Sequence, residues 1–324
     1  MRSLTQSLFV TALFAAALTT GLASPAAAQM ELKIMAPAAP GGGWDQTARS
    51  MQQALNAEKL VKSSQVINVA GAGGAVGLAQ FINGAKGDGN QIMVNGFVMV
   101  GALLLNKSPV TLDQVTPIAR LTEEIEIVVV PANSPIKNAK DLAAALKENV
   151  ARVTWAGGSA GGVDQITAAL FAQAVGADAS KVNYVAFSGG GESLAAILGG
   201  KVTAGISGWS EYEGQVKAGK LRAIGVTSEQ RIPGVDIPTF KEQGVDLVIA
   251  NWRSVMAPPG ISAEQKKNLI ELMDKLTKSA AWKEQLKQKG WDDAYISGDA
   301  FGAFLKKEIA RVNDVLKSVG LVKS

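Results

Sequence analysis

Short apolar runs alternate along the chain with segments of helical spacing. The runs have the length and composition of buried strands, and we expect strands at 32–35, 66–69, 91–94, 125–130, 153–155, 184–187, 202–206 and 221–226. In the other segments apolar residues recur three and four positions apart, as at Ala48, Met51 and Leu55, at Leu269, Met273 and Leu276, and at Leu305, Ile309, Val312 and Leu316. This alternation predicts the α/β class, with mainly parallel strands covered by helices.

Proline-containing stretches divide this pattern. The run 125–130 ends in Pro131-Ala132-Asn133-Ser134-Pro135, a turn of the kind that leaves one domain for another. Two later proline-containing stretches, 231–238 and 257–260, lie where we expect the chain to return to the first domain. We therefore expect a discontinuous domain 1 of residues 29–127 plus 252–324, and an inserted domain 2 of residues 128–251. The 324 residues suffice for two cores of ordinary size.

The first residues have the pattern of an export signal. Arg2 precedes an apolar run over residues 8–22, and Ala26, Ala27 and Ala28 supply the small residues that signal peptidase requires. The run is shorter than the roughly 20 residues of a spanning helix, and no cysteine follows it for lipid attachment. We expect a signal peptide over residues 1–28, cleavage after Ala28 and a soluble periplasmic protein.

Composition excludes several kinds of chemistry. The chain has no cysteine and no histidine, so it has no disulfide, no thiolate metal site and no histidine base or zinc ligand. Its 32 basic and 28 acidic residues leave a net charge of +4, spread without a basic block, which disfavours nucleic acid as a partner. Without histidine, we also expect no pocket side chain to titrate near neutral pH unless its pKa is strongly perturbed, so that affinity between pH 6 and 8 follows the ionisation of the ligand.

Four glycine-rich turns each follow an expected strand and precede an expected helix. They are Pro40-Gly41-Gly42-Gly43-Trp44-Asp45, Gly71-Ala72-Gly73-Gly74-Ala75-Val76-Gly77, Gly157-Gly158-Ser159-Ala160-Gly161-Gly162 and Ser188-Gly189-Gly190-Gly191-Glu192-Ser193. Glycine lets a ligand approach the backbone closely, and the first turn of a helix offers unpaired N–H groups to an anion. Such turns gather at the carboxyl ends of strands in open α/β sheets. The sequence therefore predicts an anion-binding pocket.

Enzymatic interpretations of these turns are weaker. In 71–77 the third glycine of a dinucleotide fingerprint is replaced by Val76. The turn around Ser159 fits the G-x-S-x-G nucleophile elbow, but the chain has no histidine to serve as its base. An exported serine hydrolase using Ser159 remains the alternative. The pairs Glu123-Glu124 and Asp292-Asp293 are not interpreted as acid/base or metal-binding groups, because neighbouring side chains point in different directions and neither pair has the spacing of a calcium loop.

An ordered set of motifs resembles the Bug-type (TctC-like) receptors of tripartite tricarboxylate transporters. The motifs are 36–45 with Arg49, 70–74, 198–202, 217–223, 237–240, and Trp252 before Ala257-Pro258-Pro259-Gly260. The resemblance covers essentially the whole mature chain. It implies a two-domain periplasmic-binding-protein fold (type II, Venus flytrap) with a ligand cleft between the domains. It also implies a receptor without cofactor that binds a small carboxylate, citrate or another tri- or dicarboxylate, and delivers it to a permease of one large and one small membrane subunit. We expect a monomer.

The resemblance also implies which residues contact the ligand. They are Ala38, Pro40, Gly41, Gly42, Gly43, Trp44, Asp45, Gly73, Gly74, Ala75, Gly158, Ser159, Ala160, Gly161, Gly162, Gln165, Ser188, Gly189 and Gly190. A sensor that presents its ligand to a kinase would share the same pocket. Asp164 departs from the pattern, because an acid repels an anionic ligand unless it faces away, caps the helix or meets a cation. For Asp45 we favour a loop-bracing role, and Trp44 and Trp209 are either pocket walls or core.

Overall fold

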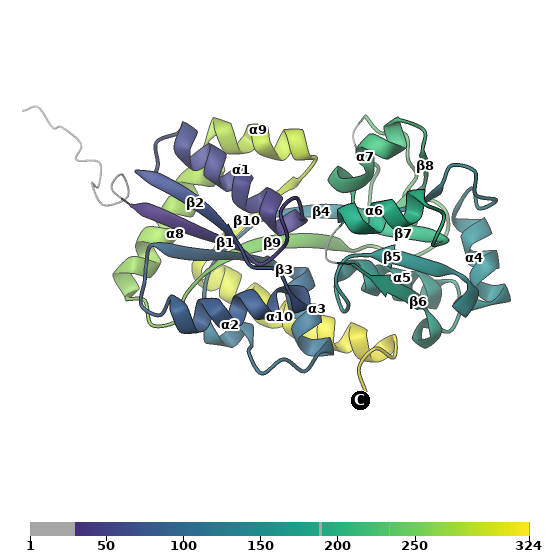
Figure 1. The fold of residues 1–324 in the computed structure, drawn as a ribbon, viewed down its shortest axis with the longest axis horizontal. Helices are drawn as coiled ribbons and strands as arrows, with labels where there is room; N and C mark the ends of the chain where they lie inside the picture. The colour runs from purple at the N-terminus through teal and green to yellow at the C-terminus, as the bar shows by residue number, and fades with distance from the viewer. Residues whose placement is uncertain (1–29, 188–189, 233, 324) are drawn as a thin grey trace, which may run out of the picture.

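The computed structural model describes residues 30–187, 190–232 and 234–323. The expected signal peptide, Ser188 and Gly189 lie outside the described residues. Two β-sheets that share strand β4 (Thr116–Pro131) form two lobes side by side, each with helices packed against its sheet (Figure 1). The α/β class is therefore confirmed.

The first lobe is built on a sheet in the order β2-β1-β3-β9-β4, with β10 beside β4. Its other strands are β1 (Glu31–Ala36), β2 (Ser63–Asn68), β3 (Gln91–Gly96), β9 (Ala250–Ala257) and β10 (Asp292–Ser297). β2, β1 and β3 are parallel, whereas β9 runs antiparallel to both β3 and β4. Its helices are α1 (Gly43–Ala57), α2 (Ala75–Gly84), α3 (Phe97–Leu105), α8 (Ala263–Lys278), α9 (Ala280–Lys289) and α10 (Gly298–Ser318). In Figure 1, α1 and α9 lie above this sheet, and α2, α3 and α10 lie below it.

The second lobe repeats this plan on a smaller scale. Its sheet has the order β6-β5-β7-β4, with β8 also paired to β4. The strands are β5 (Thr154–Gly157), β6 (Asn183–Ala186), β7 (Ala204–Gly208) and β8 (Leu221–Val226). The helices are α4 (Ala139–Glu148), α5 (Val163–Ala174), α6 (Gly190–Leu198) and α7 (Trp209–Lys217). Again three parallel strands, β6, β5 and β7, are followed by an antiparallel pairing with β4.

β4 joins the two lobes. Its residues up to Ile125 pair with β9, and from Glu126 onward they pair with β7 and β8. The domain boundaries at 127/128 and 251/252 stay a prediction, and this change of partner near Ile125 supports them.

This central region contains more strand residues than its apolar runs predict. β4 begins at Thr116 rather than at 125, and neither β9 nor β10 was expected. The early part of β4 and the middle of β9 contain polar residues that are nevertheless buried, among them Thr122, Glu124 and Arg253. Because apolar runs were the signal used, strands whose polar groups are paired inside the protein escaped it.

The helical predictions are confirmed. The apolar stripes of α1, α8 and α10 face the core, and Ser262 forms a capping box with Gln265 at the start of α8. The Asn138 side chain caps α4 by accepting from the Asp141 N–H. Within the described ranges, no helix has both the length and the apolar character needed to cross a bilayer.

Candidate ligand-binding cleft

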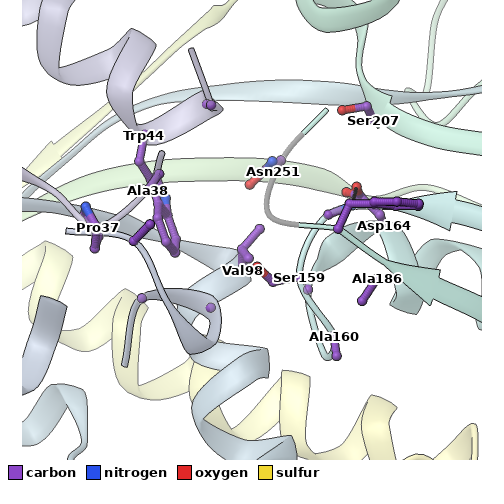
Figure 2. Close-up of a pocket in the computed structure, with 18 of the residues that line it drawn as sticks. Pro37, Ala38, Trp44, Val98, Ser159, Ala160, Asp164, Ala186, Ser207 and Asn251 are labelled. Carbon is purple, nitrogen blue, oxygen red and sulfur yellow. Dashed lines mark hydrogen bonds between the residues drawn. The ribbon is translucent and has the colours of Figure 1, made fainter. Parts of the chain in front are cut away.

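A cavity of about 440 Å³ is lined by residues of both lobes. Figure 2 shows Pro37, Ala38 and Trp44 on one side, Asp164 on the other, and Asn251 between them. The volume lies in the range of pockets that hold small molecules. Its walls come from the turns at the carboxyl ends of the parallel strands in the two lobes, as expected for an open α/β sheet.

Most of the predicted contact residues meet in this cavity. Those that line it are Ala38, Gly42, Gly43, Trp44, Gly73, Gly74, Gly158, Ser159, Ala160 and Gly162. Their assignment as ligand contacts stays a prediction. Trp44 forms part of the wall, whereas Trp209 packs in a hydrophobic cluster with Ile127 and Val129, so the first is a pocket residue and the second is core.

Other predicted residues lie behind the cavity wall. Among the described residues, Pro40, Gly41, Asp45, Ala75, Gly161 and Gln165 do not line it. Two of them brace a turn instead, because the Gln165 side chain accepts a hydrogen bond from the Gly161 N–H at 2.7 Å. These residues shape the loops that the neighbouring glycines present to the cleft.

Glycine is required at the turn before α2. Gly74 has a φ of 92°, and a Cβ placed there would lie 2.5 Å from Met99 Cε and 2.9 Å from the Trp44 ring. Gly73 also has a positive φ, and its Cβ would lie 2.3 Å from that of Ala102. The backbone of Gly73 and Gly74 therefore lines the cleft without side chains. The first turn of α2 leaves N–H groups available to an anion.

Asp45 braces the first of these turns. It is 2% exposed and accepts hydrogen bonds from Gly41 N at 2.8 Å, Asn68 Nδ2 at 2.8 Å and Arg49 Nε at 2.9 Å. Burial alone raises the pKa of this carboxyl, but the hydrogen bonds from Arg49, Gly41 and Asn68 outweigh burial and lower it. This geometry agrees with the bracing role favoured from the sequence.

Asp164 is the second residue of α5 and lines the cavity, whereas Asp45 is the third residue of α1 and does not. Its carboxylate accepts from Gly158 N at 2.6 Å, and none of the ion pairs among the described residues includes it. Burial raises its pKa to about 6, although the hydrogen bond from Gly158 acts in the opposite direction. Asp164 is thus a charged wall residue that the predicted contact set left out.

Besides Asp164 and Glu192, Glu211 is an acid in the wall. It lies in the first turn of α7 and accepts a hydrogen bond from the Ser207 hydroxyl. Burial raises its pKa to about 7, with a further increase from the nearby Glu124. Asp164 and Glu211 are the exception that the expectation allowed for strongly perturbed groups, because burial raises the pKa of these carboxyls toward the range that histidine would otherwise occupy.

A buried ion pair between the two central strands borders the cavity. Glu124 Oε2 of β4 accepts from Arg253 Nη2 of β9 at 2.5 Å, and Glu124 Oε1 accepts from the N–H of Ser210 in α7 at 2.8 Å. Glu124 is fully buried and Arg253 is 3% exposed. No signal in the sequence marks this ion pair, which forms because β4 turns Glu124 toward Arg253.

Glu126, two residues further along β4, is also buried, and neither of its carboxyl oxygens has a hydrogen-bond partner in the described part of the chain. Burial raises its pKa well above the usual value, and the charges of Asp164 and Glu124 add to this effect. A neutral Glu126 is the form that this site favours.

The structure also adds Ser207, Asn251 and Arg253 to the cavity wall. Each is a single polar residue within or beside a strand, and no spacing or motif marks it in the sequence. Ser159 lines the cavity, but its hydroxyl has no basic hydrogen-bond partner among the described residues. The arrangement required of a serine nucleophile is therefore missing from this part of the chain.

Residues 47–321 match the family described as the tripartite tricarboxylate transporter family receptor, TctC. The chain is 28% identical over 271 residues to a UPF0065 protein of Agrobacterium vitis, covering 80% of this chain and 77% of the relative. It is 26% identical to BugT of Bordetella pertussis, with 98% of both chains covered.

Solved structures share the fold. The periplasmic binding protein BugD superposes with a TM-score of 0.80 at 23% identity, covering 91% of this chain and 99% of BugD. MatC from Rhodopseudomonas palustris, with bound malate, gives a TM-score of 0.78 at 23% identity, covering 88% of this chain and 98% of MatC. The expected periplasmic-binding-protein fold is thus confirmed. The family consists of binding proteins rather than enzymes, which removes the serine hydrolase alternative. The chain belongs to the TctC family of receptors of tripartite tricarboxylate transporters.

Proposed function

We propose that this receptor works in the periplasm, binds a small di- or tricarboxylate in the cleft between its lobes, and delivers it to a membrane permease. The observation that carries the proposal is the meeting of glycine-rich helix starts from both lobes around one cavity. Backbone N–H groups at such starts bind carboxylates without a cationic side chain. A permease of one large and one small membrane subunit, a monomeric receptor and cleavage after Ala28 belong to the same proposal.

Ligands of structural neighbours support the carboxylate class. MatC was solved with malate, and another R. palustris protein, with a TM-score of 0.79 to this chain at 21% identity, was solved with adipate. Both ligands are dicarboxylates, which makes a dicarboxylate at least as good a candidate here as citrate. Membership of a transporter receptor family favours delivery to a permease over presentation to a sensor kinase.

The proposal is tested by thermal unfolding of refolded, ligand-stripped protein with a panel of mono-, di- and tricarboxylates, with and without Mg²⁺. A ligand at 100 times its Kd adds about 2.7 kcal/mol to the unfolding free energy, which raises Tm by several degrees. Gly74→Ala should abolish that shift, because its Cβ enters the space of Met99 and Trp44 at a positive φ. Gly84→Ala, at the open end of the same helix, should bind like the wild type. The absence of a shift with every carboxylate would refute the proposal.

A further inference from the structure

Charge is distributed unevenly over the walls of the cleft. Among the described lining residues, the one basic side chain is that of Arg253 on β9. The lining acids Asp164, Glu192 and Glu211 all belong to helices of the second lobe. Where these acids are ionised, they repel a ligand carboxylate strongly, because little water screens charges inside a cleft. A carboxylate therefore has one favoured end of the cleft, the end at Arg253.

The guanidinium of Arg253 is held from several sides. Its Nη2 donates to Glu124 Oε2 at 2.5 Å, and its Cζ lies 4.9 Å from the centre of the Trp291 ring. A Cβ built on Gly43 would lie 2.9 Å from the same Nη2, so the guanidinium also lies close against the backbone of the first glycine-rich turn. These contacts fix the group before a ligand arrives, and a fixed group loses little conformational freedom on binding.

One nitrogen of this group has nothing to bind. Arg253 is 3% exposed, and its Nη1 has no hydrogen-bond partner in the described part of the chain. A guanidinium nitrogen can only donate, and a buried charged donor without an acceptor is costly. Two residues earlier on the same side of β9, the Oδ1 atom of Asn251 also lacks a partner within the described ranges, and Asn251 lines the cavity too (Figure 2). This side of β9 thus presents unsatisfied polar atoms to the cleft.

Arg253 lies beside the start of α1. Gly43 is the first residue of that helix and lines the cavity together with Trp44. The N–H groups of a first helical turn have no acceptor within the helix, and the helix dipole adds a partial positive charge there. The contact between Gly43 and the guanidinium brings both kinds of donor to one point of the cleft. The buried, unpartnered Nη1 is an independent sign that this point receives an acceptor from a ligand.

We propose that Arg253 determines the charge specificity of the receptor, with its Nη1 donating to a carboxylate of the ligand beside the first turn of α1. This inference deepens the proposed function and rests on it. Helix starts alone can bind a carboxylate, but a hydrogen bond from a guanidinium to a carboxylate is stronger than one from a neutral donor. Arg253 therefore discriminates a carboxylate from a neutral group of the same shape. Glu124 then orients the guanidinium for binding as well as pairing with it.

Calorimetric titration of the ligand-stripped protein tests this assignment with a matched pair of ligands. The pair is the tightest binder among succinate, glutarate, adipate and citrate, and its monoamide, in which a neutral carboxamide replaces one carboxylate. We expect the wild type to bind the acid about tenfold or more tightly than the monoamide, as expected for one hydrogen bond between charged groups. In Arg253→Gln/Glu124→Gln, which leaves neither charge of the pair buried alone, this ratio should fall severalfold.

A second variant separates contact with the ligand from support of the fold. Arg253→Lys keeps a cation for Glu124, but its single nitrogen cannot reproduce the two-sided contact of a guanidinium. It should keep most of the stability in urea and lose most of the ratio. The matched control is Arg120→Gln/Glu123→Gln, which removes another arginine–glutamate pair, on β4 and outside the cavity. This control should leave the ratio unchanged.

The outcomes distinguish this inference from the function on which it rests. Equal binding of acid and monoamide by the wild type, or a wild-type ratio in Arg253→Lys, would overturn the role of Arg253 and leave the carboxylate receptor standing. Circular dichroism checks the fold of each variant, and the lysine variant decides the question if the double variant fails that check. If the wild type binds none of the four acids, the proposed function itself fails.

Discussion

Asp45 and Asp164 show how one residue type in the first turn of a helix acquires two electrostatic states. Both follow a glycine N-cap, both are nearly buried, and both hold the N–H of a glycine in the preceding turn. Arg49 and Asn68 stabilise the charged form of Asp45 and lower its pKa, whereas burial dominates at Asp164 and raises its pKa. The difference arises from the neighbours that each lobe packs against the carboxylate.

These shifts predict that the ligand-free protein loses stability as pH rises. Asp164 and Glu211 have pKa values of about 6 and about 7 in the folded protein, and such carboxyls have a pKa of about 4 in the unfolded chain. At a pH between the unfolded and the folded value, each carboxyl therefore binds more protons in the folded state. The free energy of unfolding therefore decreases from pH 5.5 to pH 8, by on the order of 2 kcal/mol for Asp164 and Glu211 together. Urea unfolding at several pH values measures this slope.

The chain has no histidine that would add a slope of its own in this range. The double variant Asp164→Asn/Glu211→Gln should flatten the dependence, and Glu213→Gln should keep it. A wild-type stability that stays level or increases toward pH 8 would show that the two carboxyls titrate at ordinary values.

At the scale of elements, β4 and β9 connect the cleft to both lobes. Glu124 of β4 binds Arg253 of β9 and the Ser210 N–H at the start of α7, so one carboxylate holds three elements together. A Cβ at Gly208, the residue before α7, would lie 2.4 Å from that carboxyl, which shows how closely the helix start is packed on it. The orientation of α7, and with it Glu211, depends on this ion pair.

Removing one partner of the Glu124–Arg253 pair should lower the free energy of unfolding much more than removing both. Arg253→Met leaves the Glu124 charge buried without its cation, and we expect a loss of about 3–5 kcal/mol in the free energy of unfolding. Arg253→Met combined with Glu124→Gln removes both charges and should recover a large part of that loss. Chemical denaturation of the two variants measures the difference. If both variants lose the same amount, the ion pair is not the source of the cost.

At the scale of the whole molecule, the lobes touch at glycines on one side of the cleft. A Cβ on Gly101 of α3 would lie 1.9 Å from the carbonyl oxygen of Gly161 in the turn before α5. The end of α10 also reaches the second lobe, where the Ser318 carbonyl accepts from Gln173 Nε2 at 3.4 Å (Figure 1). The close approach of the lobes at Gly101 and Gly161 therefore requires that neither position carries a side chain.

Gly101→Ala should hold the lobes apart. Overpacking of this kind costs about 1–3 kcal/mol, which corresponds to a roughly 5- to 150-fold weaker ligand affinity when binding requires the contact. Calorimetry gives the affinity, and small-angle X-ray scattering should give a larger radius of gyration with ligand present. Gly84→Ala, whose Cβ meets open space, serves as the control. Wild-type affinity and dimensions in Gly101→Ala would show that the contact plays no part in binding.

The sequence by itself determined the α/β class, the helix stripes and caps, and most of the glycines that meet in the cleft. Each of these features is local, because apolar spacing and glycine turns specify backbone shape within a few residues. The order of the motifs also identified the receptor family, and the match over residues 47–321 confirms it.

The tertiary structure alone decided the chemistry of the cleft wall. Glu124 and Arg253 are 129 positions apart, and only strand pairing brings them into contact. The raised pKa values of Asp164 and Glu211 depend on burial by distant elements, which no spacing in the sequence reports. Burial and charge pairing are properties of neighbours in space, so the acidic character of the second lobe became visible only once the chain was folded.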